Sequence, residues 1–98
     1  MQDNRQRIHQ ETSYADVHGA RLAYDMAGEG PPVVLIHAGI ADRRMWDDQV
    51  MPLAQHHTLM RYDMRGFGDS EPPPGSFAHH RDLHGLLRHR LNRLDLDP

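Results

Sequence analysis

Two short runs of small and polar residues carry the chemistry that this sequence could perform. The first, His37-Ala38-Gly39, directly follows the apolar run from Val33 to Ile36. Small residues beyond a buried strand let backbone N–H groups approach a ligand, and such groups can stabilise a negatively charged oxygen. The same three residues would also form an ordinary turn between a strand and a helix. The residues alone leave both interpretations open.

The second run spans residues 63–70 and has the sequence DMRGFGDS. Gly66 and Gly68 permit a positive φ in a tight loop. We expect the Asp63 carboxylate to accept backbone N–H groups within that loop, and Arg65 to pair with a carboxylate. Each of these roles is structural, so the run predicts an ordered loop rather than a reactive group.

The nine histidines are the candidates for metal binding. His80 and His84 stand four residues apart, with His79 and His89 nearby, and this spacing can place two ligands on one helix face. No third ligand and no catalytic glutamate stand in a suitable place. Because a leucine stripe shares this segment, we expect the histidines on its solvated face. We predict neither a metal site nor a cofactor.

Composition limits the classes of protein to which the chain can belong. Its 98 residues suffice for one small domain. Cysteine is absent, which excludes disulfides and cysteine chemistry and favours a reducing, cytoplasmic location. The formal net charge of −3 does not favour nucleic acid as a partner. No apolar run approaches the ~18 residues of a membrane span. Residues 1–12 are polar and predict a disordered leader, and residues 13–98 predict the domain.

The N-terminal half of the domain predicts strands. Residues 14–18 and 21–26, with a turn between them, predict a hairpin. Polar and apolar residues alternate in the second run, which predicts an edge-type strand. The apolar runs 33–36 and 58–62 predict inner strands, and the first of these should be buried on both faces.

Two helices should pack on these strands. The first begins near Asp42, a good N-cap residue, and Pro52 should kink or interrupt it. Its apolar face consists of Trp46, Val50, Leu53 and Ala54. The second has Ser76 as its candidate N-cap, and its stripe consists of Leu83, Leu86, Leu87, Leu91 and Leu94. Alternating strands and helices predict an α/β fold with a parallel sheet.

These elements and motifs resemble the opening of α/β-hydrolase domains. The family pattern has His-Gly after the third strand, then Trp, then Asp-x-Arg-Gly-x-Gly-x-Ser after the fourth. This sequence has His37, Trp46 and the run 63–70 in those places, and departs from the pattern at Ala38. The resemblance covers roughly residues 14–94. It implies the N-terminal half of an α/β-hydrolase sheet: a hairpin, then strand-helix-strand-helix with parallel inner strands.

By this resemblance, the parent protein would hydrolyse an ester, lactone or related bond of a small-molecule substrate by Ser-His-acid catalysis. Gly39 has the position whose backbone N–H contributes to the oxyanion hole, whereas His37 is structural. The nucleophile would sit on a Gly-x-Ser-x-Gly elbow after the fifth strand, and this sequence has none. We therefore expect no nucleophile, base or acid here, and a truncated hydrolase that is inactive alone. The resemblance gives structural roles to Ala38, Trp46, Asp63, Arg65, Gly66, Gly68 and Ser70.

Two alternatives need weighing against this interpretation. Gly68-Asp69-Ser70 imitates the Gly-Asp-Ser block of another esterase family, but there the serine follows an apolar strand directly and opens a helix. Here Phe67 precedes the block, and prolines follow it. The other alternative is a non-enzymatic interaction protein. In the family the fifth strand pairs beside the third, so residues 33–36 would keep an open edge. A second copy or a complementing C-terminal fragment could pair there.

Overall fold

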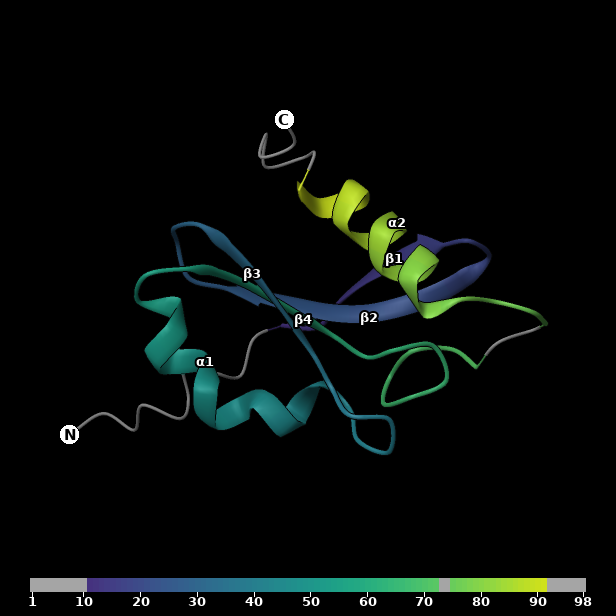
Figure 1. The fold of residues 1–98 in the computed structure, drawn as a ribbon, viewed down its shortest axis with the longest axis horizontal. Coiled ribbons are helices and arrows are strands. Elements are labelled where there is room, and N and C mark those ends of the chain that lie inside the picture. Colours follow the sequence, from purple (N-terminus) through teal and green to yellow (C-terminus); the bar gives the residue numbers. More distant parts are fainter. Residues whose placement is uncertain (1–10, 73–74, 92–98) are drawn as a thin grey trace.

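A computed structural model describes residues 11–72 and 75–91 (Figure 1). Its elements are β1 (Ser13–Val17), β2 (Ala20–Ala27), β3 (Pro32–Ile36), η2 (Arg43–Trp46), α1 (Asp47–Ala54), β4 (Thr58–Tyr62) and α2 (His79–Leu91). The strands form one mixed sheet in the order β1-β2-β4-β3. This architecture confirms the predicted α/β class and the predicted order of elements.

The first two strands form the predicted hairpin. β1 and β2 are antiparallel and are joined at His18 and Gly19. Both residues have positive φ, 47° and 85°, which is the geometry of a type I′ turn and matches the twist of the strands. The prediction that the second strand is of edge type is wrong. β2 lies between β1 and β4, and residues 22–25 are all buried.

The two inner strands of the sequence prediction are adjacent and parallel, as expected. Val33 pairs with Leu59, and Leu35 pairs with Arg61. β4 is an inner strand of the sheet. The prediction that residues 33–36 are buried on both faces is wrong. Among the described residues no strand pairs with the other side of β3, and Ile36 is 45% exposed.

The helices cover opposite faces of the sheet (Figure 1). Strand side chains alternate between the faces, so Met60 and Tyr62 of β4 pack on the α2 side whereas Leu59 packs on the α1 side. The α2 side also holds Leu83, Leu86 and Leu87 of the predicted stripe. The side chain of Leu91 and all of Leu94 lie outside the described part of the chain.

Both helices differ from the sequence prediction at their ends. Asp42 caps a 3₁₀ turn, η2, which leads into α1. Pro52 does not interrupt α1, which continues to Ala54. Pro52 lies in the last turn of α1, its ring is exposed, and two further residues follow it in the helix. Ser76 is not the N-cap of α2, since α2 begins at His79 and its first bonded N–H groups reach the Ala78 carbonyl.

No helix in the described residues is long and apolar enough to cross a membrane. Residues 1–10, most of the predicted leader, lie outside the described residues. Thr12, which the sequence prediction placed in that leader, accepts a hydrogen bond from Arg43 Nη2 at 2.6 Å.

Candidate functional site

The site lies where β3 and β4 end. Because these strands are parallel, their carboxyl ends meet at one edge of the sheet, which is where ligands bind in open α/β sheets. The segment after β3, residues 37–42, and the segment after β4, residues 63–70, therefore come together there. Their contacts decide which groups remain available to a ligand.

His37 joins the two segments. Its side chain is buried, and its Nε2 accepts the Met64 N–H at 2.9 Å. Its Nδ1 lies 2.7 Å from the Ala38 carbonyl oxygen. Because Nε2 acts as the acceptor, the proton of the neutral ring must be on Nδ1, which then donates to Ala38. The edge of the ring also packs against Phe67, with centroids 5.4 Å apart.

Residues 38–41 form a turn in which the Ala41 N–H donates to the Ala38 carbonyl at 3.0 Å. The Ala38 N–H donates to the sulfur of Met45 at 3.2 Å. No described residue accepts a hydrogen bond from the Gly39 N–H. Gly39 is exposed, and a Cβ built on it would meet nothing within 4 Å. The turn therefore presents one free backbone donor to an open space.

Ala38 stands where the family pattern has glycine, and the structure shows why alanine fits. Of the described non-glycine residues, His18 alone has positive φ, so Ala38 adopts an ordinary backbone conformation. Its Cβ therefore imposes no left-handed strain on the turn.

The loop after β4 has the geometry that its sequence predicts. Gly66 and Gly68 have positive φ, 87° and 51°. The Asp63 carboxylate accepts the Asp69 N–H at 2.9 Å and the Arg43 N–H at 2.7 Å. A Cβ on Gly68 would overlap that carboxylate, so the loop requires glycine there. Both predictions about this loop, the positive φ and the bonds to Asp63, are confirmed.

A buried network of ion pairs lies beneath the two segments, and the sequence analysis missed it. Asp25 of β2 accepts from Arg43 Nε at 2.9 Å and from Arg61 Nε at 2.7 Å. Arg43 also pairs with Asp63, and Arg61 pairs with Asp47 at 2.5 Å. The sequence did contain an indication of this network, since Asp25 and Arg61 are charged residues inside otherwise apolar strands. A charged residue in a buried strand needs a buried partner.

Burial and pairing act in opposite directions on the two arginines. Burial by itself would lower the pKa of Arg43, but hydrogen bonds to Asp25 and the charge of Asp63 outweigh it and raise the pKa. Burial likewise opposes the charge of Arg61, whose pKa is raised by Asp25 and Asp47. Both guanidinium groups therefore remain charged and fix the segments that they join.

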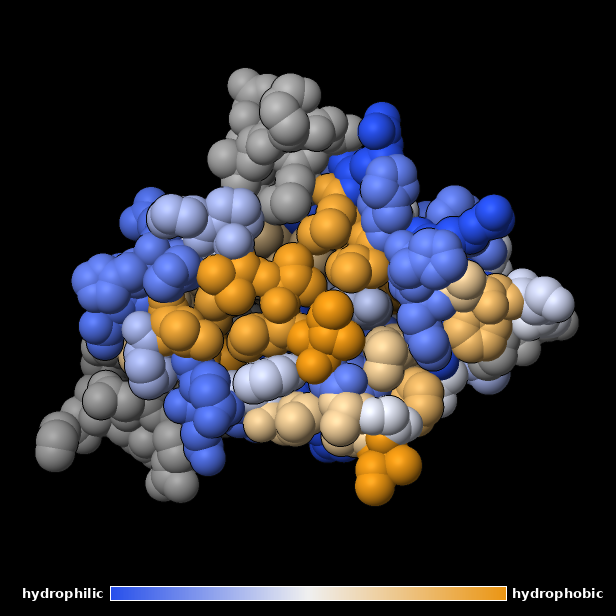
Figure 2. Space-filling view, viewed as in Figure 1, coloured by the Kyte–Doolittle hydropathy of each residue, from blue (hydrophilic) through white to orange (hydrophobic). Residues whose placement is uncertain are grey.

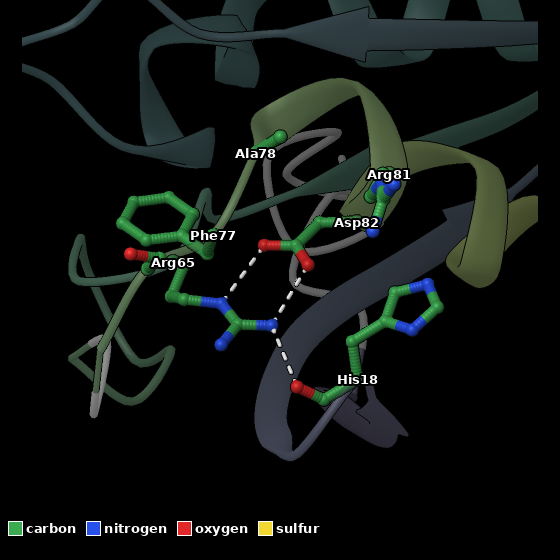
Figure 3. Close-up of a pocket in the computed structure, with 7 residues that line it drawn as sticks. His18, Arg65, Phe77, Ala78, Arg81 and Asp82 are labelled. Carbon is green, nitrogen blue, oxygen red and sulfur yellow. Dashed lines mark hydrogen bonds and ion pairs between the residues drawn. The ribbon is translucent and has the colours of Figure 1, made fainter.

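Arg65 pairs with a carboxylate, as predicted. Its Nε and Nη2 bind the two oxygens of Asp82 in α2 at 2.9 and 2.8 Å, and both side chains are 2% exposed (Figure 3). Nη2 also donates to the Val17 carbonyl at 3.0 Å. Phe77 lies beside the guanidinium. The pair ties the loop to α2 and to the end of β1.

Ser70 has the surroundings of a structural serine. Its side chain is buried, its hydroxyl donates to the Asp63 carbonyl at 2.6 Å, and it accepts the Ala23 N–H at 2.8 Å. Among the described residues, the Ser70 hydroxyl therefore forms hydrogen bonds with backbone groups only, and none with a side chain that could act as a base. This geometry gives no support to the alternative in which Ser70 is the nucleophile.

Trp46 and the histidines complete the predicted set. Trp46 packs with Leu35, Val50 and Leu59, and its buried Nε1 has no hydrogen-bond partner in the part of the chain that the structure describes. His80 and His84 are exposed on α2, as predicted, and line an open cavity of about 380 Å³ with His18 and Arg81. No group of three or more ligating side chains among the described residues could hold a metal ion.

Comparison with known proteins identifies the family. The sequence pattern of the alpha/beta hydrolase family matches residues 33–97. The chain belongs to the α/β-hydrolase family. An uncharacterised protein of Mycobacterium tuberculosis is 35% identical to it over 85 residues, which are 86% of this chain and 24% of that protein. A soluble epoxide hydrolase of a Corynebacterium species is 38% identical over 63 residues, which are 64% of this chain and 22% of that enzyme.

Solved α/β-hydrolase structures show the same arrangement. The enol-lactonase of Burkholderia xenovorans has a TM-score of 0.72 and 38% identity, and the match covers 76% of this chain and 32% of the lactonase. An epoxide hydrolase, CorEH, has a TM-score of 0.76 and 33% identity, with 81% of this chain and 29% of that chain covered. The chain thus spans about a quarter of the length of the curated relatives that it matches.

Proposed function

We propose that this chain provides the Gly39 N–H as one oxyanion-hole donor of an α/β-hydrolase. The whole enzyme would cleave an ester, lactone or related bond of a small-molecule substrate. The supporting observation is the turn at residues 38–41, which leaves the Gly39 N–H exposed and without a partner among the described residues. A preformed donor of this kind stabilises the negative oxygen that develops during acyl transfer.

The catalytic triad is no part of this chain in our proposal. The 98 residues contain no Gly-x-Ser-x-Gly elbow, and the hydroxyl of Ser70 is bonded to backbone groups. Nucleophile, base and acid would therefore come from sequence beyond these residues. The second oxyanion donor would come with them, because it belongs to the residue after the nucleophile. The lack of cysteine supports a cytoplasmic location as a further part of the proposal.

The first test is an assay of the 98-residue chain with an activated ester and a serine-directed fluorophosphonate probe. We expect no saturable turnover and no labelling, because a positioned donor without a nucleophile and a base cannot form an acyl-enzyme. Exposed histidines would give only slow hydrolysis without saturation. Stoichiometric labelling of Ser70 would overturn the proposal.

The second test joins the chain to a C-terminal α/β-hydrolase fragment that carries the elbow, acid and base. In the complemented enzyme Gly39→Pro removes the N–H and should lower kcat by about 10²–10³-fold, the usual cost of one oxyanion donor. Gly39→Ala is the matched control, because it keeps the N–H and its Cβ would meet nothing within 4 Å. Equal activity of the two variants would contradict the proposal.

The open edge of β3 favours a second candidate function, in which the chain acts as a complementing or self-associating partner. Figure 2 shows an apolar area beside α2 on the face of the sheet that α2 partly covers. Val34 and Ile36 of β3 alternate onto this face, and Ile36 is 45% exposed. Analytical ultracentrifugation would detect self-association, which Ile36→Lys should abolish. A monomer at all concentrations would exclude pairing with itself.

A further inference from the structure

The peptide group between Ala38 and Gly39 has two hydrogen-bonding ends. Its carbonyl oxygen accepts from His37 Nδ1 at 2.7 Å and from the Ala41 N–H at 3.0 Å. Its N–H is the Gly39 donor. In a planar trans peptide the C=O and the N–H point in opposite directions. Whatever fixes the direction of the Ala38 carbonyl therefore also fixes the direction of the Gly39 N–H.

The imidazole that fixes this carbonyl is itself held firmly. His37 is 3% exposed, its Nε2 accepts the Met64 N–H, and its ring edge contacts Phe67. The bond to Met64 leaves Nδ1 as the protonated nitrogen of the neutral ring. The loop after β4 thus selects the tautomer with which His37 binds the turn after β3.

We propose that His37 is a positioning residue of the oxyanion hole, whose Nδ1–H both aims and polarises the Ala38–Gly39 peptide. A hydrogen bond to a carbonyl strengthens the N–H of the same peptide as a donor, because the two dipoles polarise each other. This inference rests on the proposed role of Gly39 and adds a function to a residue that the sequence analysis treated as structural.

A merely structural His37 would act through its other nitrogen. The bond from the Met64 N–H to Nε2 ties β3 to the loop after β4 and needs no contact with Ala38. The two roles therefore use different ring nitrogens, and two substitutions separate them. His37→Asn places an amide N–H near the position of Nδ1, so it can still donate to Ala38. His37→Gln places an amide oxygen near the position of Nε2, so it can still accept from Met64.

The first measurement is nuclear magnetic resonance on the isotope-labelled 98-residue chain. In the wild-type protein the ring signals of His37 should show a protonated Nδ1 and an unprotonated Nε2. The Gly39 amide resonance should stay close to its wild-type position in His37→Asn and move in His37→Gln. A proton on Nε2, or equal displacement of Gly39 in both variants, would overturn the proposal. If a variant does not fold, the ring tautomer of His37 in the wild-type protein still tests the proposal.

The second measurement is the activity of the complemented enzyme described above. His37→Gln should lower kcat by about tenfold with little change in KM, less than the loss of the donor itself, whereas His37→Asn should stay within about twofold. The reverse order would show that His37 acts only through Met64. If Gly39→Pro leaves the activity intact, the proposed function fails, and the resonance comparison still decides whether His37 fixes the Ala38–Gly39 peptide.

Discussion

The segments after β3 and β4 lie against each other, yet they differ in what they do with their polar groups. In the loop 63–70, Asp63, Arg65 and Ser70 are buried and bonded to described residues. In the turn 38–41, the Gly39 N–H has no such partner. A loop that satisfies its own polar groups provides structure, whereas a loop that leaves one donor free can offer it to a ligand. The longer sequence motif is therefore the structural one.

The comparison also shows how the two segments depend on each other. Asp63 receives the N–H and the guanidinium of Arg43, and His37 receives the N–H of Met64. The turn with the free donor is thus held at both ends by the loop 63–70. Substitutions in the loop should mainly change stability, and substitutions in the turn should mainly change the activity of the complemented enzyme.

The largest expected effect is that of Asp63→Ala. It removes the acceptor for Arg43 and for the Asp69 N–H and leaves part of a buried positive charge unpaired. Breaking a buried ion pair from one side costs about 3–5 kcal/mol, a large share of the ~5–15 kcal/mol of a typical domain. Urea unfolding followed by circular dichroism would measure it. Asp16→Ala, at an exposed position in β1, is the control and should change stability little. Similar values for the two variants would show that Asp63 does not anchor the loop.

A pair of glycine substitutions tests the contrast directly. Gly68→Ala should destabilise the chain by roughly 1–3 kcal/mol, since its φ is 51° and the new Cβ would overlap the Asp63 carboxylate. Gly39→Ala should change stability by less than about 0.5 kcal/mol, because its Cβ enters open space. The same urea unfolding measures both. Equal costs would remove the distinction between a packed loop and an open turn.

Local patterns predicted much of the fold from the sequence. The positions of the hairpin, both parallel strands and the leucine stripe follow from residue periodicity, and the bonds to Asp63 follow from the spacing of the glycines. What the sequence did not predict depends on partners distant in the chain. β2 was taken for an edge strand because Arg21 and Asp25 alternate with apolar residues, but Asp25 is buried between Arg43 and Arg61.

The candidate site shows the same limit. The sequence located Gly39 by resemblance, but neither the bond from His37 to Ala38 nor the sulfur acceptor at Met45 could be predicted from it. Those contacts require the relative placement of segments that are adjacent only after folding. The start of α2 was misplaced for a local reason: Ser76 is a good capping residue, but the first helical N–H groups bond to the Ala78 carbonyl instead.

Ser70 allows a smaller test on the structural side of the comparison. Ser70→Ala leaves the buried Ala23 N–H without its acceptor and should cost about 1–2 kcal/mol. Ser76→Ala, at an exposed position, is the control and should be nearly neutral. Thermal unfolding distinguishes the two. In the complemented enzyme Ser70→Ala should keep its fluorophosphonate labelling, since Ser70 is not the nucleophile in our proposal, and loss of labelling would reverse that assignment.

Substitution of Asp42, which directly follows the turn at residues 38–41, should have the smallest effect. Its side chain caps η2 through the Arg44 N–H, and hydrogen bonds from the Arg44 side chain and backbone lower its pKa from 3.8 to about 2. A lowered pKa in the folded state gives a stabilisation that is present above the unfolded pKa and is lost as the pH falls through the folded one. Asp42→Ala should cost at most about 1 kcal/mol near neutral pH.

Asp42→Asn retains a capping oxygen but cannot titrate, so its difference in stability from wild type should be constant above pH ~5 and shrink below pH ~4. Carboxyl resonances followed against pH would show the Asp42 side chain still ionised at pH ~3. A midpoint near 3.8 would mean that neither hydrogen bond from Arg44 to the Asp42 carboxylate forms in solution, and that Asp42 does not cap η2.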